Sequence, residues 1–142
     1  MNRGNTTLTM IKPDAVEAKK AGIILDKIIE AGFDIVALKM KRFTKSEAEL
    51  FYQEHSERPF FPELVDFMIS GPILAGVLKK ENAVEEFRSF IGDTNPENAR
   101  EGSIRKLYGK SISFNAIHGS DSDQSAKREI DLHFSDDEIL NI

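Results

Sequence analysis

One histidine, His118, occupies the most chemically suggestive part of this chain, the segment Asn-Ala-Ile-His-Gly-Ser-Asp-Ser. A strand is predicted over residues 111–117, just ahead of it, and Gly119 would permit a tight turn. Ser122 would then cap a helix over residues 123–133. An imidazole held at such a junction keeps one ring nitrogen open to a substrate, so it can act as a nucleophile or as a general base.

Glu129 lies on the predicted helix that follows His118. A carboxylate there could reach back and fix the tautomer and orientation of the imidazole, while the alternative is a solvated glutamate paired with a lysine or arginine. The other two histidines have no catalytic context. We expect His55 to face solvent at a helix end and His133 to end the last helix, where a positive charge suits the helix dipole.

Three cations stand where they could form a phosphate pocket. Lys12 ends a predicted strand, Arg88 lies on a predicted helix, and Arg105 follows a glycine-containing loop. Each alone is more often a solvated surface charge. Together with His118 they could surround a polyphosphate, with forked contacts from arginine and a point charge from lysine. Spacing alone does not show that they converge.

The familiar phosphate-binding loops are missing from this sequence. No G-x-G-x-x-G motif occurs, and the Gly-Lys-Ser at residues 109–111 is a chance likeness to a Walker A loop, because Ile104 stands at its first glycine position. Phe60 follows Arg-Pro in a predicted turn. If exposed, it would offer a flat face on which a nucleobase can stack with little sequence preference. Its neighbour Phe61 is expected in the core.

Hydrophobic periodicity and turn signals predict the order β-α-β-α-α-β-α-β-α. The strands are expected over residues 6–12, 33–41, 73–78 and 111–117, and the helices over residues 21–31, 44–54, 62–69, 82–90 and 123–133. This connectivity favours the α+β class, as a ferredoxin-like split βαβ sandwich whose four-stranded antiparallel sheet is covered by helices. A doubly wound parallel sheet is the alternative, weakened by the lack of a Gly-rich loop after the first strand.

Composition narrows the class of protein. The 142 residues suit a single domain over residues 1–142, with a short acidic tail at residues 135–142. The chain has no cysteine and a formal charge of −5, which argues against thiolate chemistry and against general nucleic-acid binding. Its amino terminus lacks a signal-peptide core, and its longest apolar run is too short to cross a bilayer. We expect a cytoplasmic protein without a membrane partner.

Six motifs spread along the chain resemble those of one enzyme family. They are TMIKPDAV (residues 9–16), ERPFF (57–61), SGP (70–72), GDTNP (92–96), GSIR (102–105) and NAIHGSDS (115–122). In this order and over residues 6–134, they closely resemble nucleoside diphosphate kinase in its bacterial form. The resemblance implies ping-pong transfer of the γ-phosphate of a nucleoside triphosphate, mainly ATP, to nucleoside diphosphates, which maintains the triphosphate pools.

The resemblance also implies roles for individual residues. His118 would be the nucleophile and would carry the phosphoryl group on its pros nitrogen, Nδ1. Glu129 and Ser120 would orient the imidazole, and Tyr52 would support the catalytic end of the site. The expected nucleotide-binding residues are Lys12 for the phosphates and ribose, Arg88, Thr94 and Arg105 for phosphate oxygens, Asn115 for the ribose, and Phe60 for the base.

The resemblance further implies Mg²⁺ as the cofactor, brought by the nucleotide, so no protein metal site is expected. It also implies a homo-oligomer, either a tetramer or a hexamer. Three departures from the family pattern lie near the phosphate-binding residues. Ser103 replaces the usual threonine, Asp93 adds a negative charge beside Thr94, and residues 106–110 differ from the more common sequence after Arg105. Two alternatives stay open: a binding module for RNA or protein that leaves His118 idle, and a phosphohistidine carrier that passes phosphate to another protein.

Overall fold

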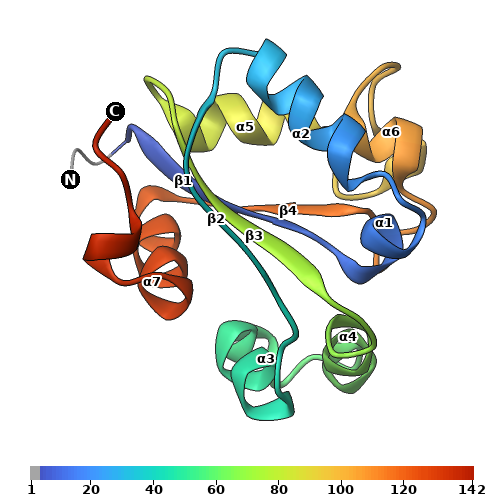
Figure 1. The fold of residues 1–142 in the computed structure, drawn as a ribbon. Helices are drawn as coiled ribbons and strands as arrows, with labels where there is room; N and C mark the ends of the chain where they lie inside the picture. The colour runs from blue at the N-terminus through green and yellow to red at the C-terminus, as the bar shows by residue number, and fades with distance from the viewer. Residues whose placement is uncertain (1–3) are drawn as a thin grey trace.

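Four strands form one sheet in a computed structural model that describes residues 4–142 (Figure 1). The strands are β1 (Thr6–Ile11), β2 (Asp34–Lys41), β3 (Ile73–Lys79) and β4 (Ile117–Gly119). They lie in the order β2-β3-β1-β4, and every neighbouring pair is antiparallel. The arrangement confirms the predicted α+β fold with a four-stranded antiparallel sheet, and the parallel alternative is wrong.

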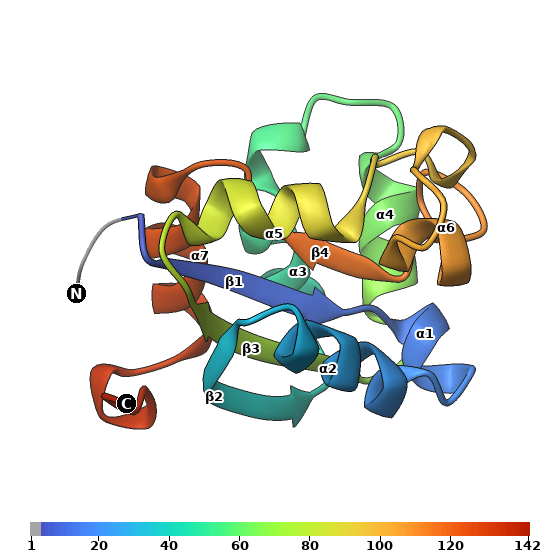
Figure 2. The same cartoon turned by 90° about the horizontal axis from the view of Figure 1, so that it is seen from above.

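Helices cover both faces of this sheet, as Figures 1 and 2 show from two directions. The helices are α1 (Pro13–Glu17), α2 (Ala21–Glu30), α3 (Lys45–Phe51), α4 (Phe61–Met68), α5 (Ala83–Ile91), α6 (Ile104–Tyr108) and α7 (Asp123–His133). One face packs on α2, α5 and α6, and the other packs on α3, α4 and α7. β3 is therefore covered on both sides, as its unbroken apolar pattern predicts. No helix within residues 4–142 has the length and apolar character to cross a membrane.

Local signals account for the starts of α3 and α7 and for the end of α2. Thr44 and Glu47 form the capping box predicted at the start of α3, with each side chain bonded to the other's backbone N–H. The Ser122 hydroxyl accepts from the Ser125 N–H and caps α7, and Gly32 follows α2 at a φ of 95°. The short helices α1 and α6 were not predicted, because five residues carry too little periodicity to show a pattern.

The exposed side of β2 differs from the simple alternating pattern. Alternation predicts that Val36, Leu38 and Met40 share one face, and this is wrong. Val36 is buried, but Leu38 is 44% exposed and Met40 is 60% exposed. A bulge between Ile35 and Ala37 shifts the register against β3, and one extra residue sends every later side chain to the opposite face.

The fourth strand is shorter than predicted and lies later in the chain. It was expected at residues 111–117, yet β4 begins only at Ile117. Ahead of it, Ile112 and Phe114 are exposed, and a turn at Ala116, where φ is 75°, interrupts the extended chain. His118 therefore does not precede a turn: it lies in the middle of the strand and pairs with Met10 of β1.

Gly119 also has a different role from the predicted turn. It lies inside β4, and a Cβ at this position would come within 2.9 Å of the Phe87 ring and 3.2 Å of Ile91 on α5. Glycine here allows the strand beside His118 to pack closely against the helix.

His133 ends α7 as predicted, but the expected positive charge is wrong, because the side chain is a buried aromatic ring. Its ring packs 5.3 Å from Phe43 and 5.4 Å from Phe51, and within residues 4–142 neither ring nitrogen has a hydrogen-bond partner. Burial, helped by the charge of Lys41, lowers the pKa of His133 to about 4. The side chain is therefore neutral at physiological pH and packs as an apolar ring.

The substitution His133→Phe is expected to stabilise the fold, and increasingly so as the pH falls from 7 toward 4. The unfolded imidazole takes up a proton below its ordinary pKa of 6.5, whereas the folded one resists protonation until about pH 4. Wild-type stability therefore falls with pH across this window, by up to about 1.4 kcal/mol per pH unit, and phenylalanine removes this slope.

Urea unfolding at pH 7, 6 and 5 measures the effect. His55→Phe serves as the control, because it replaces a more exposed histidine in the same way. An identical pH slope for wild type and His133→Phe would show that His133 is not buried in its neutral form.

Candidate active site

The predicted site residues converge on one pocket of about 550 Å³. Those that line it are Lys12, Tyr52, Phe60, Arg88, Thr94, Arg105, Asn115, His118 and Glu129. Only Ser120 lies outside the lining, and it contacts Glu129 from behind. The fold thus brings together side chains that are separated by up to 117 positions (12 to 129) in the chain.

A carboxylate holds the ring of His118. Nε2 of His118 lies 2.8 Å from Oε1 of Glu129, and the Ser120 hydroxyl donates to the same carboxylate oxygen at 2.7 Å. The Leu8 N–H donates in turn to the Ser120 oxygen at 3.3 Å, which ties the group to β1. A carboxylate only accepts, so Nε2 carries the ring proton and Nδ1 keeps its lone pair. Nδ1 is therefore the ring nitrogen that can act as a nucleophile.

Phe51 is a site residue that sequence reasoning missed. Its ring meets the His118 ring edge-on, with centroids 5.3 Å apart and an interplanar angle of 76°. Arg128, next to Glu129 on α7, donates to the carbonyls of Leu50 and Phe51 at 2.7 and 3.3 Å. Helix α7 therefore holds the end of α3 as well as the imidazole. An apolar helix residue gives no signal of this role in the sequence.

Lys12 and Asn115 form a buried polar pair. The Lys12 ammonium donates to Oδ1 of Asn115 at 2.8 Å, and the Asn115 amide donates to the carbonyl of Thr94 at 3.0 Å. Burial, together with the positive charge of Arg105, lowers the pKa of Lys12 to about 8. Its ammonium therefore loses its proton at a lower pH than an ordinary lysine does.

Arg105 is a buried guanidinium fixed by the backbone. It donates to the carbonyl of Gly92 at 3.1 Å and to that of Ile117 at 2.9 Å, so it links the loop before α6 to β4. Burial and the nearby charge of Arg88 lower its pKa to about 10, while Asp93 opposes that shift. Asp93, which departs from the family pattern, therefore partly offsets the positive charge of the pocket. Its side chain does not line the pocket, so it does not block the entry of a ligand.

Tyr52 gives the pocket a buried hydroxyl, and Phe60 gives it an exposed aromatic ring. The Tyr52 hydroxyl is buried, has no hydrogen-bond partner within residues 4–142, and has its pKa raised by burial and by the charge of Glu129, so it stays a donor. Phe60 is 44% exposed, as a stacking residue requires. His55 was expected to face solvent, but it is half-buried, lines the pocket, and packs its ring 5.6 Å from that of Phe60.

The pocket is a poor protein cage for a metal ion. Within residues 4–142, no group of three or more His, Asp or Glu side chains is placed to hold one. The carboxylates of Glu54 and Asp121 do line the pocket. Mg²⁺ usually keeps several waters and binds one or two carboxylates together with substrate phosphates, so the residues present fit an ion that enters on a polyphosphate.

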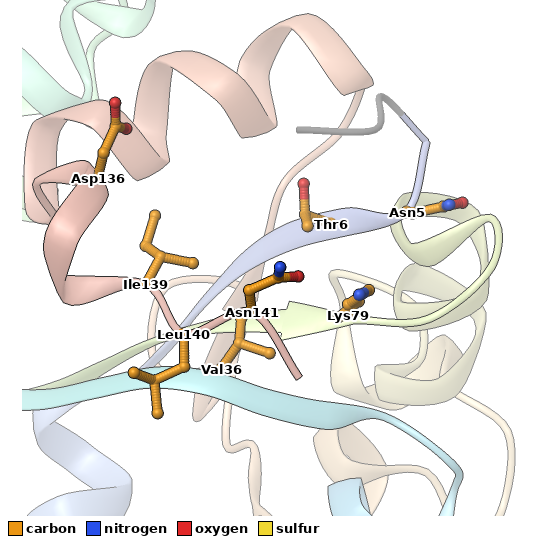
Figure 3. A pocket seen from close by; sticks show the side chains of 8 residues that line it. All are labelled: Asn5, Thr6, Val36, Lys79, Asp136, Ile139, Leu140 and Asn141. Carbon is orange, nitrogen blue, oxygen red and sulfur yellow. The ribbon is translucent and has the colours of Figure 1, made fainter.

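A second pocket, of about 490 Å³, lies at the other end of β1 (Figure 3). The C-terminal residues 135–142 form part of its wall, where the Leu140 N–H donates to the Val36 carbonyl at 2.9 Å. Its lining contains no histidine and none of the residues predicted to react or to bind phosphate. This second pocket therefore lacks the side chains that phosphoryl transfer would require.

Comparison of the sequence with known proteins points to the same family as the site residues do. A family model described as nucleoside diphosphate kinase matches residues 5–139. The nucleoside diphosphate kinase of Flavobacterium psychrophilum is 53% identical over 131 residues, covering 92% of this chain and 94% of its own. That of Pasteurella multocida is 53% identical over 134 residues, covering 94% and 96%.

Solved structures give the same result. The Aquifex aeolicus nucleoside diphosphate kinase superposes with a TM-score of 0.93 at 50% identity, over 96% of this chain and 99% of that one. A Halobacterium salinarum nucleoside diphosphate kinase in complex with CDP gives 0.94 at 37% identity, over 96% and 91%. Because these matches span almost the whole chain, the protein belongs to the nucleoside diphosphate kinase family and is an enzyme of nucleotide metabolism that works through a phosphohistidine.

Proposed function

We propose that His118 carries the phosphoryl group in the γ-phosphate transfer that this family catalyses. The observation that carries the proposal is the 2.8 Å contact between Nε2 of His118 and Glu129, at a pocket that also contains Lys12, Arg88 and Arg105. This contact leaves the Nδ1 lone pair as the nucleophile, and the cations supply the charge stabilisation that phosphoryl transfer requires.

The reaction then consists of two displacements at one phosphorus. In the first, Nδ1 of His118 attacks the γ-phosphorus of a nucleoside triphosphate, an N–P bond forms, and the bond to the β-phosphate oxygen breaks, releasing the diphosphate. In the second, a terminal β-phosphate oxygen of another diphosphate attacks the same phosphorus and the N–P bond breaks. The proton stays on Nε2, hydrogen-bonded to Glu129, throughout both steps, so the imidazole is regenerated without a proton transfer.

The other residues would hold the phosphates and the ribose. Arg88, Thr94 and Arg105 would bind phosphate oxygens, where a forked guanidinium suits a tetrahedral anion. Lys12 would contact phosphate and ribose and Asn115 the ribose, which their side-chain hydrogen bond supports because it places both polar ends together.

The base would bind at the rim of the pocket. Phe60 would stack on the base. Ile112 also lines the pocket, is 58% exposed, and adds apolar surface that sequence reasoning missed. Neither side chain can read the hydrogen-bonding edge of a base, so this contact would accept purines and pyrimidines alike.

Further parts of the proposal rest on family membership. Tyr52 would donate its hydroxyl at the catalytic end, and Ser120 would fix Glu129. Mg²⁺ would enter with the nucleotide and neutralise charge on the phosphate oxygens. The chain would work in the cytoplasm as a homo-oligomer, a tetramer or a hexamer, and as one domain over residues 1–142.

Phosphoryl trapping tests the nucleophile. The protein is incubated with Mg²⁺ and γ-labelled ATP, isolated, and then given GDP. We expect an acid-labile, alkali-stable label on His118 that leaves as GTP, because a phosphoramidate N–P bond hydrolyses in acid. His118→Ala should fold and take no label, while the matched variant His55→Ala should still be labelled.

Label or turnover in His118→Ala would exclude His118 as the carrier. Label that stays until another protein is added would instead identify a phosphohistidine carrier. A folded wild type that takes no label but binds RNA would be a binding module.

Nucleotide binding should weaken as the pH rises through about 8, because the pKa of Lys12 is lowered to about 8 and its charge is present below that value and lost above it. The terminal phosphate ionises near pH 6, so its own titration is complete before this range. Steady-state kinetics from pH 7 to 9.5 should show the KM for nucleoside diphosphate rising above about pH 8. A KM that stays constant over this range would place the charge of Lys12 outside the binding interaction.

A further inference from the structure

One residue just ahead of His118 has a strained backbone. Ala116 has a φ of 75° and is completely buried, and across it the Ile117 N–H donates to the Asn115 carbonyl at 2.9 Å. A hydrogen bond from residue i+2 to residue i with a positive φ between them defines a γ-turn of the strained kind. Such a conformation persists only where the surrounding structure holds it in place.

This turn changes which side chains reach the pocket. Side chains alternate along an extended strand, so residues 115 and 118 would point to opposite faces if the strand continued through them. Both Asn115 and His118 nevertheless line the same pocket. The turn at Ala116 directs the Asn115 side chain toward Lys12 while allowing β4 to begin at the next residue.

The start of α1 holds both polar backbone groups of Ala116. The Ala116 N–H donates to Oδ2 of Asp14 at 3.1 Å, and its carbonyl accepts from the Lys12 N–H at 2.9 Å. Asp14 is half-buried, and within residues 4–142 its second oxygen, Oδ1, is buried without a partner. The same carboxylate interacts with the charge of Lys12 and with the backbone N–H groups of Asp14 and Ala15 at the start of α1. Among its hydrogen-bond partners, the Ala116 N–H is the one that lies outside α1.

We propose that Asp14 is a positioning residue whose carboxylate holds the γ-turn at Ala116 and thereby sets Asn115 and His118 in place beside Lys12. This inference rests on the function proposed for those three residues. Without the carboxylate, the buried N–H of Ala116 lacks its acceptor and the residue can relax to a negative φ. The Asn115 side chain would then move away from the pocket.

The substitution Asp14→Ala should therefore lower kcat and raise KM together. A displacement of about 1 Å at a catalytic group is enough to reduce kcat/KM by roughly 10- to 100-fold. A merely structural defect would lower the active fraction, and with it kcat, at an unchanged KM. Asp14→Asn keeps a carbonyl acceptor and should retain most of the activity, and Glu17→Ala, an exposed acid on the same helix, is the control.

A rescue experiment separates the turn from every other role of Asp14. Glycine adopts a φ of 75° without strain, so Ala116→Gly should hold the turn without help from a carboxylate. We expect Ala116→Gly alone to stay close to wild type, and Asp14→Ala with Ala116→Gly to recover most of the lost kcat/KM. Wild-type kinetics in Asp14→Ala, or a loss that Ala116→Gly does not reduce, would overturn the proposal.

A measurement on the wild type covers the case in which Asp14→Ala does not fold. The Ala116 amide should exchange its hydrogen slowly, and exchange as fast as that of the exposed Ile112 would overturn the proposal. Phosphoryl trapping on the same wild-type sample distinguishes the two failures. A protein that takes no label refutes the proposed function, whereas a labelled protein with unaltered Asp14→Ala kinetics refutes only the positioning role.

Discussion

The whole site depends on how a strand of three residues, β4, is held against β1. A strand this short gains little stability from its backbone pairing alone. Neighbouring groups must therefore hold it in place. The Arg105 guanidinium donates to the Ile117 carbonyl, and Gly119 lets the Phe87 ring pack directly against the strand. His118 lies between these two anchors and takes its rigidity from them. A small misplacement of β4 would therefore change the position of His118, the proposed nucleophile.

The charge of the pocket follows from the same construction. Lys12 and Arg105 are each 6% exposed, and their hydrogen bonds go to the neutral oxygens of Asn115, Gly92 and Ile117. Neutral acceptors orient the two cations without cancelling their charge. Burial lowers the pKa of both groups, because their charges are poorly solvated in the free protein. A polyphosphate would meet cations already oriented in a medium of low dielectric, where the attraction is strongest.

The sequence predicted the parts of this fold that have long patterns or clear end signals. α7 begins and ends where its Ser122 cap and apolar spacing place it, and the sheet follows from the order of the elements. All the predicted site residues except Ser120 line one pocket, although spacing could not show that they converge, and their roles stay predictions. β4 was misplaced because the apolar residues ahead of Ala116 resemble a strand, while the turn itself contains neither glycine nor proline. Phe51 was missed because its contact with His118 exists only in the tertiary structure.

Two kinds of unfavourable energy meet in this pocket, and they differ in what can relieve them. The strained turn at Ala116 costs on the order of 1–3 kcal/mol, and bound nucleotide does not change its backbone chemistry. The poorly solvated charges of Lys12 and Arg105 are different, because a phosphate anion offsets them directly. Nucleotide binding should thus relax the electrostatics of the site and leave its geometry unchanged. That division suits a ping-pong enzyme: donor and acceptor would each bring the compensating charge in turn, while His118, the proposed nucleophile, would stay in one position for both half-reactions.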